Sequence, residues 1–316
     1  MKTSSSTYLD IRGLRYHVRS WGREGAPKLF MLHGWMDASA SFQFFVDALQ
    51  GDWHVIAPDL RGYGQTQWQG SDTYWFFDYV LDLDRILDHF QPDAPVNLIA
   101  HSFGGNIASI YSGSMPHRIA RFVNIDAFGP RAEGVKPARL EHKAQKEGQP
   151  APEDTVEIPP RRYAEWLDRV KKGSRFKDFD TFEDLEKRLR RAHPRVTPER
   201  IAFLARHWGK LREDGRVMMS TDPGNAQNDG IHITVRMDEA IGCWQNISAP
   251  VLWLIPEEGA SKSRAKELAN GGAESRLQHF RTRREVRIPE CGHMVHIEKP
   301  ELLAQLVESF MTEADK

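Results

Sequence analysis

The segment AHSFGG, residues 100–105, places Ser102 where a strand-like run ends and a helical pattern begins. APVNLIA before it is a mainly apolar run typical of a strand, and FGGNIASIYSGSM after it has apolar residues at helical spacing. A sharp strand-to-helix turn lifts a serine hydroxyl above the sheet edge, and it needs small residues two positions before and after the serine. Ala100 and Gly104 meet that need. The same position also suits a plain helix N-cap, in which the hydroxyl binds a backbone N–H.

Nucleophilic chemistry at Ser102 requires three further groups. A serine hydroxyl is a weak nucleophile, so it needs a general base, a group that orients the base, and donors for the oxyanion. The loop PECGHMVHIEKPE, residues 289–301, offers two histidines as bases, His293 and His296. Carboxylates follow two strand-like runs: Asp126 ends RFVNID, and Glu257 and Glu258 follow VLWLI.

Strand-like runs alternate with helical patterns around these residues. The runs are TYLDI, LRYHVRSW, KLFMLHG, WHVIAP, APVNLIA, RFVNID, APVLWLI and REVRIP. Arg12 and Gly13 mark the turn of a hairpin between the first two runs. Helical spacing occurs in SFQFFVDAL, in residues 73–90, in SRAKELAN and in PELLAQLVESF. This alternation predicts an α/β fold whose mainly parallel sheet is covered by helices on both faces.

The pattern changes after the run RFVNID. The next hundred residues contain the Pro-rich stretch QPAPEDTVEIPP and charged helical patterns, but little that resembles a buried strand. TFEDLEKRL begins with a capping-box signal at Thr181, and TPERIAFLARHW begins with Thr197 as N-cap and Pro198 in the first turn. We therefore expect a core in two parts, residues 1–129 and 233–316, interrupted by a helical cap over residues 130–232.

Four motifs in this order resemble the α/β-hydrolase-fold superfamily. LHGW (32–35) resembles the oxyanion turn after the third strand, and PDLRGYGQT (58–66) resembles the D-x-R-G-x-G-x-S segment, with Thr66 in place of serine. AHSFGG resembles the nucleophile elbow, usually G-x-S-x-G, and PECGHMVHIEKPE resembles the loop of the catalytic histidine. The resemblance covers nearly the whole chain. It implies an α/β-hydrolase fold with an eight-stranded, mainly parallel sheet, flanking helices and a helical cap above the elbow.

The resemblance also implies roles for single residues. His293 is the expected base, because the first histidine of GHxxHxExP is the working one in such family members. The oxyanion hole is expected from the backbone N–H groups of Trp35 and Phe103. Residues beside these turns are pocket candidates, and they are His33, Gly34, Trp35, Phe128 and Met294.

The carboxylate is the irregular part of the resemblance. Relatives usually carry it after the strand that is VLWLI in this chain, where Gly259 stands. In some members, such as part of the haloalkane dehalogenase group, it lies at the tip of the strand after the nucleophile helix, where Asp126 stands. Neighbouring strands are about 4.8 Å apart, so either tip can reach the histidine. We take Asp126 as the acid, with Glu258 and then Glu257 as alternatives.

The nucleophile separates functions within the superfamily. Dehalogenases and epoxide hydrolases use an aspartate at the elbow, so Ser102 argues against both. LHGWMDASASF, VNIDAFGP and STDP (220–223) resemble the serine-hydrolase-like subgroup, of esterase and lipase type. We expect a serine hydrolase that cleaves a carboxylic ester or related acyl bond through an acyl-enzyme. The alternatives are a C–C bond hydrolase of the same fold and a non-catalytic ligand-binding homologue, which the missing acid after VLWLI suggests.

Bulk properties favour a small-molecule substrate over nucleic acid or membrane. The formal net charge is -1, so the chain has no overall positive field that would attract nucleic acid or an anionic membrane surface. The histidines lack ligand spacing and no Gly-rich phosphate loop occurs, so neither metal nor cofactor is expected. No run approaches the roughly 18 apolar residues of a membrane span, no signal-peptide pattern opens the chain, and only two cysteines occur. These features predict a cytoplasmic protein, and they leave its oligomeric state open.

Overall fold

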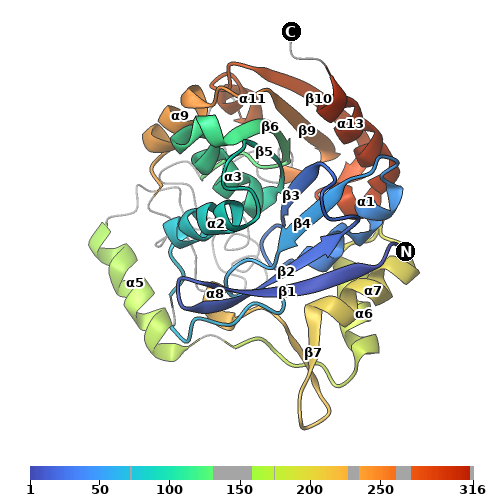
Figure 1. Cartoon of the computed structure of the whole chain (residues 1–316). Coiled ribbons are helices and arrows are strands. Elements are labelled where there is room, and N and C mark those ends of the chain that lie inside the picture. Colours follow the sequence, from blue (N-terminus) through green and yellow to red (C-terminus); the bar gives the residue numbers. More distant parts are fainter. Residues whose placement is uncertain (72, 131–158, 174, 227–234, 261–271, 314–316) are drawn as a thin grey trace.

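The computed structural model describes residues 1–71, 73–130, 159–173, 175–226, 235–260 and 272–313. Within them, eight strands form one sheet in the order β1-β2-β4-β3-β5-β6-β9-β10 (Figure 1). The strands are β1 (Ser4–Ile11), β2 (Leu14–Trp21), β3 (Lys28–Leu32), β4 (His54–Pro58), β5 (Val96–His101), β6 (Ile119–Ile125), β9 (Val251–Glu258) and β10 (Arg283–Gly292). Neighbours from β4 to β10 pair in parallel, while β2 is antiparallel to β1 and β4. The mainly parallel eight-stranded sheet expected from the sequence is confirmed.

The opening hairpin closes through a two-residue turn. Arg12 and Gly13 have φ angles of 52° and 78°, and the flanking Ile11 and Leu14 pair with each other. A turn with two positive φ angles has a twist that matches the right-handed twist of the strands it joins. The turn predicted at these residues is therefore confirmed.

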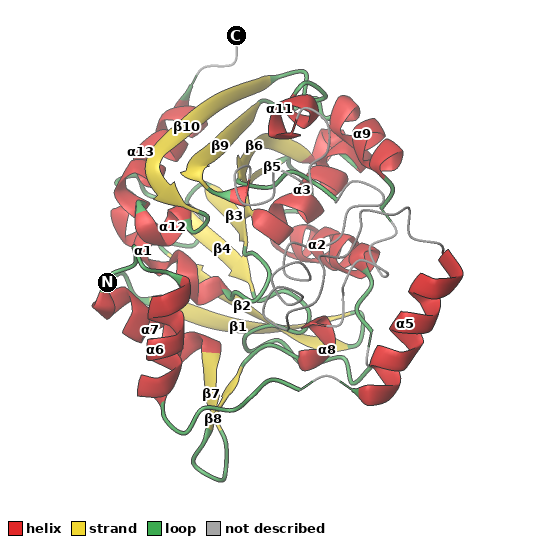
Figure 2. Cartoon of the chain, turned by 180° about the vertical axis from the view of Figure 1, so that it is seen from behind, coloured by secondary structure: helices red, strands yellow, loops and turns green. Residues whose placement is uncertain are grey.

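Helices cover both faces of the sheet (Figure 1, Figure 2). One face carries α2 (Phe76–Phe90), α3 (Ser102–Ser114), α9 (Met237–Asn246) and α11 (Gly272–Leu277). The other carries η1 (Ser39–Phe42), α1 (Gln43–Ala48), α12 (Val295–Glu298) and α13 (Pro300–Thr312), while the short turn η2 (Pro116–Arg118) precedes β6. Because the central strands bury both faces, a run such as HVIAP is buried at every position and shows no apolar–polar alternation.

The elements of the expected cap lie between β6 and α9 in the chain. They are α5 (Pro159–Lys172), α6 (Phe182–Ala192), α7 (Pro198–Trp208), the hairpin of β7 (Gly209–Leu211) and β8 (Val217–Met219), and α8 (Pro223–Ala226). The hydroxyls of Thr181 and Thr197 cap α6 and α7 by accepting the backbone N–H three residues later, as the sequence predicts. Helices α6 and α7 lie side by side, whereas α5 stands apart from them (Figure 1, Figure 2).

Some details differ from the sequence expectations or fall outside the described residues. The β7–β8 hairpin was not expected, because strands of three residues are too short to show a pattern. The helix expected over residues 73–90 begins at Phe76. SRAKELAN and most of QPAPEDTVEIPP lie outside the described residues. Among the helices that are described, none is both long enough and apolar enough to cross a membrane.

Candidate active site

Ser102 stands at the junction of β5 and α3, in a strained backbone conformation. Its φ is 51°, in the left-handed region that costs energy for a residue other than glycine. The start of α3 presses against the end of β3, since a Cβ on Gly104 would lie 2.6 Å from the carbonyl oxygen of His33. His101, rather than Ser102, is the N-cap residue of α3. The Ser102 hydroxyl faces His293 instead, with Oγ 2.9 Å from Nε2.

His293 lies in the loop after β10 and joins two other side chains. Its Nε2 accepts the hydroxyl hydrogen of Ser102 at 2.9 Å, and its Nδ1–H donates to Oδ2 of Asp126 at 2.5 Å. We assign this tautomer from the partners, because a carboxylate can only accept. The Nε2–H of His101 donates to the main-chain carbonyl of His293 at 2.8 Å and so holds the loop. A ring with its acceptor toward the hydroxyl is arranged as a general base.

Asp126 stands at the tip of β6, where its φ of 54° turns the side chain toward the histidine loop. The carboxylate is buried, and Oδ2 accepts the backbone N–H of Ala260 at 2.7 Å as well as the ring of His293. A Cβ on Gly259 would lie only 2.3 Å from the same oxygen. The carboxylate from β6 therefore takes the space at the end of β9 that a side chain at position 259 would need.

Glu257 and Glu258, the alternative acids, have other partners. Glu258 pairs with Arg195 at the surface, and a carboxylate oxygen of Glu257 accepts the backbone N–H of Glu290 at 3.1 Å. Both glutamates are exposed. Of the three carboxylates considered from the sequence, the structure brings Asp126 to His293 and points the two glutamates elsewhere.

The turn after β3 lies directly beside the elbow. A Cβ on Gly34 would be 3.2 Å from Cβ of Ser102 and 2.8 Å from Nδ1 of His101, so only glycine leaves this approach open. Trp35 follows that glycine, and Phe103 follows the serine. Backbone N–H groups at these two positions are where an oxyanion hole is built in a site of this kind.

A family model described as the alpha/beta hydrolase fold matches residues 27–213. The chain belongs to the alpha/beta hydrolase family. A serine hydrolase-like protein of Danio rerio is 23% identical over 305 residues, which is 92% of this chain and 83% of that protein. A probable serine hydrolase of Drosophila melanogaster is 30% identical over 118 residues, but the match spans only 37% of this chain and 35% of the fly protein.

A solved structure resembles this alpha/beta hydrolase over almost its whole length. The thioesterase domain from the curacin biosynthetic pathway superposes with a TM-score of 0.80, covering 97% of this chain and 99% of that domain. The sequence identity is 20%, so this likeness concerns the fold. The family match and the serine hydrolase-like relatives together support a hydrolase.

In this alpha/beta hydrolase, a buried carboxylate fixes the segment PDLRGYGQT. Asp59 accepts hydrogen bonds from the ring of His17 at 2.7 Å and from the backbone N–H groups of Ser39 and Gln65 at 2.7 Å and 2.8 Å. Burial alone would raise the pKa of the Asp59 carboxyl, but the hydrogen bond and charge of His17 hold it well below its ordinary value. Thr66 donates its hydroxyl to the Asp59 carbonyl at 2.6 Å, so threonine supplies the hydroxyl expected from the family's serine.

The five pocket candidates differ in exposure. Trp35 is 48% exposed, whereas His33 and Gly34 are buried. Phe128 is fully buried with its ring centroid 5.6 Å from that of Trp253, and Met294 packs among side chains of α6 and α7. The geometry favours Trp35 for contact with a ligand, and substrate contact of any of the five stays a prediction.

The structure also gathers a buried cluster that the sequence did not predict. Asp37, His101 and His296 are all buried, and their ligand-capable atoms lie within 4.8 Å of one another. Burial, together with the nearby His293 and His296, lowers the pKa of His101 well below 6.5, so this ring is neutral near pH 7. The three residues stand in the motifs LHGWMD, AHSFGG and GHMVH, but no sequence pattern links such distant positions.

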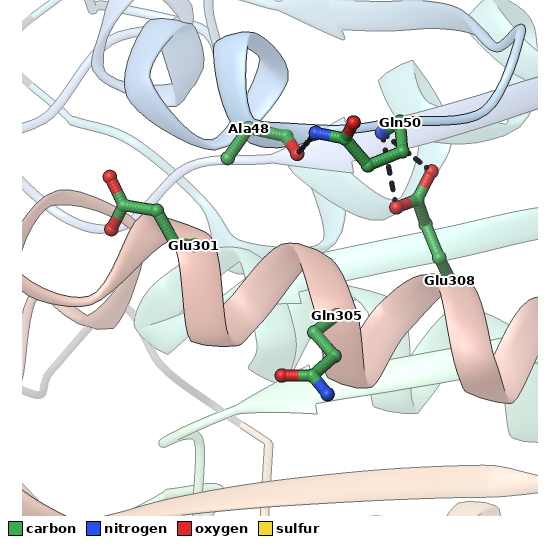
Figure 3. A pocket seen from close by; sticks show the side chains of 5 residues that line it. All are labelled: Ala48, Gln50, Glu301, Gln305 and Glu308. Carbon is green, nitrogen blue, oxygen red and sulfur yellow. Dashed lines mark hydrogen bonds between the residues drawn. The ribbon is translucent and has the colours of Figure 1, made fainter.

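A separate hollow lies between α1 and α13. Its volume is about 380 Å³, and it is lined by Ala48, Gln50, Glu301, Gln305 and Glu308 (Figure 3). The Glu308 carboxylate accepts the backbone N–H of Gln50 at 3.0 Å and 3.2 Å, which ties α13 to the end of α1. None of the residues around Ser102 lines this hollow.

Proposed function

We propose that this alpha/beta hydrolase is a serine hydrolase that cleaves a carboxylic ester or a related acyl bond through an acyl-enzyme. The observation that supports the proposal most is the chain of contacts from Ser102 Oγ through His293 to Asp126, at 2.9 Å and 2.5 Å. These contacts supply the nucleophile, base and orienting carboxylate that acyl transfer needs, in the order serine, acid, histidine along the chain.

Each side chain has a step in the proposed reaction. Oγ of Ser102 attacks the acyl carbon while its proton passes to Nε2 of His293. The carbonyl oxygen becomes an oxyanion, which the backbone N–H groups of Trp35 and Phe103 stabilise. His293 returns the proton to the leaving oxygen, and the acyl group stays on Ser102. Water then attacks this ester with His293 as base, which releases the acid and restores the hydroxyl, while Asp126 stabilises the imidazolium.

The two alternatives can be weighed against the geometry. The non-catalytic alternative rests on the missing acid after β9. The carboxylate of Asp126 lies beside Gly259 in the place of that acid, which supports the catalytic alternative. A C–C bond hydrolase would use the same three side chains, so substrates must separate it from an esterase. We expect the protein to hydrolyse p-nitrophenyl esters of graded chain length and not to cleave vinylogous diketones.

A fluorophosphonate probe tests the nucleophile directly. The probe phosphonylates an activated serine, so we expect labelling of the wild-type chain and none of Ser102→Ala. Ser114→Ala is a matched control, because this serine lies on the same helix and donates its hydroxyl to the Ile110 carbonyl. Folded wild-type protein that takes up no probe, or equal labelling of Ser102→Ala, would overturn the proposal.

We further propose that residues 130–232 form a helical cap and that the substrate is a small molecule. Cys243 and Cys291, the two cysteines of the chain, are both free thiols, which agrees with the proposed cytoplasmic location.

A further inference from the structure

The buried carboxylate of Asp37 joins three separate parts of the protein. Oδ1 accepts the indole N–H of Trp208 at 3.0 Å and the backbone N–H of Ala38 at 2.7 Å, and Oδ2 accepts the hydroxyl of Ser41 at 3.0 Å. Nε2 of His296 lies 3.4 Å from Oδ2. Asp37 belongs to the turn after β3, Trp208 ends α7 of the cap, and His296 lies in α12, directly after the catalytic loop.

The surroundings of Asp37 keep it charged. Burial would raise the pKa of this carboxyl, but the hydrogen bond and charge of His296 hold it below its ordinary value. A buried carboxylate is costly to a fold unless its oxygens are hydrogen-bonded, and here each oxygen has its own donors. The Asp37 carboxylate is therefore held by hydrogen bonds from Ala38, Ser41 and Trp208.

His296 connects this carboxylate to the catalytic histidine. Its ring centroid lies 4.7 Å from that of His101, and the ring of His101 lies 4.6 Å from that of His293. His101 also donates its Nε2–H to the His293 carbonyl at 2.8 Å. The ring of His101 is therefore packed between those of His296 and His293, and the carboxylate of Asp37 lies beside His296 and His101.

The helix pair α6–α7 supports the same loop from outside. Met294 and Ile297, on either side of His296, pack in one apolar cluster with Leu189 of α6 and Leu204 of α7. Arg200 of α7 adds a polar contact, because its guanidinium donates to the Ile297 carbonyl at 2.6 Å. This half of the cap is fastened to the loop that follows the catalytic base.

We propose that Asp37 is a positioning residue for His293, and that it acts by binding Trp208 and His296 so that α7 buttresses the catalytic loop. This inference rests on the proposed function, because it assigns support to the proposed base. Acyl transfer is sensitive to displacement, since an error of about 1 Å in a reacting group costs about 100-fold in rate. In this arrangement the α6–α7 pair supports the loop that holds His293.

Asp37→Asn and Trp208→Phe test the network from its two ends. Asp37→Asn keeps the shape and removes the charge, and Trp208→Phe removes the indole N–H. The kcat for p-nitrophenyl acetate is calculated per active site, and active sites are counted by titrating the reactive serine with fluorophosphonate. We expect both variants to lower this kcat by about 10-fold and to change KM by less than about 2-fold. We also expect faster hydrogen exchange of the backbone amides of residues 293–299. A change in stability alone would leave kcat per titrated serine at the wild-type value.

Asp178→Asn is the matched control for a carboxylate of the cap. Asp178 pairs with Arg212 and Arg216 within the cap and should leave both readouts unchanged. Arg200→Ala should speed exchange in residues 293–299, whereas Arg206→Ala, on the same helix but paired with Glu183, should not.

If Trp208→Phe had the kcat of the wild type and the same amide hydrogen exchange in residues 293–299, the inference would be overturned, whether or not Asp37→Asn folds. Wild-type protein without a reactive serine would instead overturn the proposed function, and the exchange experiment would still decide whether Asp37 and Trp208 hold the loop.

Discussion

The carboxylate of Asp126 occupies the space that a side chain at Gly259 would need. A Cβ on Gly259 would stand 2.3 Å from Oδ2 of Asp126, and the next residue, Ala260, donates its backbone N–H to that oxygen at 2.7 Å. The end of β9 thus lacks a side chain where the carboxylate from β6 enters, and it supplies a donor to that carboxylate. The carboxylate of Asp126 can take this position only because residue 259 is a glycine.

Gly259→Ala should lower kcat although Ser102, His293 and Asp126 themselves are not substituted. The added methyl group must displace the Asp126 carboxylate or the end of β9, and either movement weakens the contact with His293. We expect kcat to fall by about 10-fold or more, measured with p-nitrophenyl acetate. Gly242→Ala is the control, since a Cβ there meets nothing within 4 Å. Equal kcat in the two variants would contradict the arrangement.

Asp126→Asn should lower kcat by about 10²–10⁴-fold while the protein stays folded. The amide offers an N–H to His293 Nδ1 and so favours the wrong tautomer of the ring. Steady-state kinetics and circular dichroism measure the two parts of this expectation. Glu258→Gln and Glu257→Gln should keep near wild-type kcat, because those side chains contact Arg195 and the backbone of Glu290. Loss of turnover in Glu258→Gln with a wild-type rate in Asp126→Asn would reverse the assignment.

Local sequence features were enough to predict the sheet and the elbow. Buried strands show continuous apolar runs, and the elbow shows small residues around Ser102, because both requirements act over a few neighbouring positions. The histidine loop was predictable from its resemblance to a known motif. The choice among Asp126, Glu257 and Glu258 was harder, since it depends on which strand tip has room for a carboxylate. The absence of a side chain at Gly259 was the sequence signal for that room.

The contacts behind the loop of His293 could not be predicted in this way. Asp37, Trp208 and His296 come from three distant segments, and each has an ordinary local interpretation as a turn, core or loop residue. Their contact depends on how α7 packs against the turn after β3 and against α12, and such packing leaves no periodicity in the sequence. The same reason applies to the docking of STDP (220–223) against the loop that contains Gly62.

The buried ring of His101 should make stability depend on pH near neutrality. Burial, with His293 and His296 nearby, lowers its pKa well below 6.5. The unfolded chain takes up a proton on this histidine as the pH falls through about 6.5, while the folded chain does not, so the free energy of unfolding should decrease in that direction. One such proton contributes a slope of about 1.4 kcal/mol per pH unit.

Urea unfolding between about pH 5 and 7.5 measures this slope above the range where carboxylates titrate. His101→Gln should reduce it by up to one proton, and His89→Gln, at an exposed position of α2, should not. Burial also lowers the pKa values of His54, His193 and His207, so part of the slope should persist. An unchanged slope in His101→Gln would show that this ring binds a proton equally well in both states.

The protein should lose stability when the hydroxyl of Tyr74, which binds the STDP segment (220–223), is removed. Tyr74 donates its hydroxyl to Oδ2 of Asp222 at 2.5 Å, and the backbone N–H of Asp222 donates to the Gly62 carbonyl at 2.8 Å. A hydrogen bond to a buried carboxylate contributes about 1.5–3 kcal/mol, so Tyr74→Phe should lower the free energy of unfolding by about that amount. Tyr8→Phe is the control, because its hydroxyl binds Gln65 at an exposed site. If both variants unfolded at the same urea midpoint, the contact between Tyr74 and STDP would contribute no more than a surface hydrogen bond.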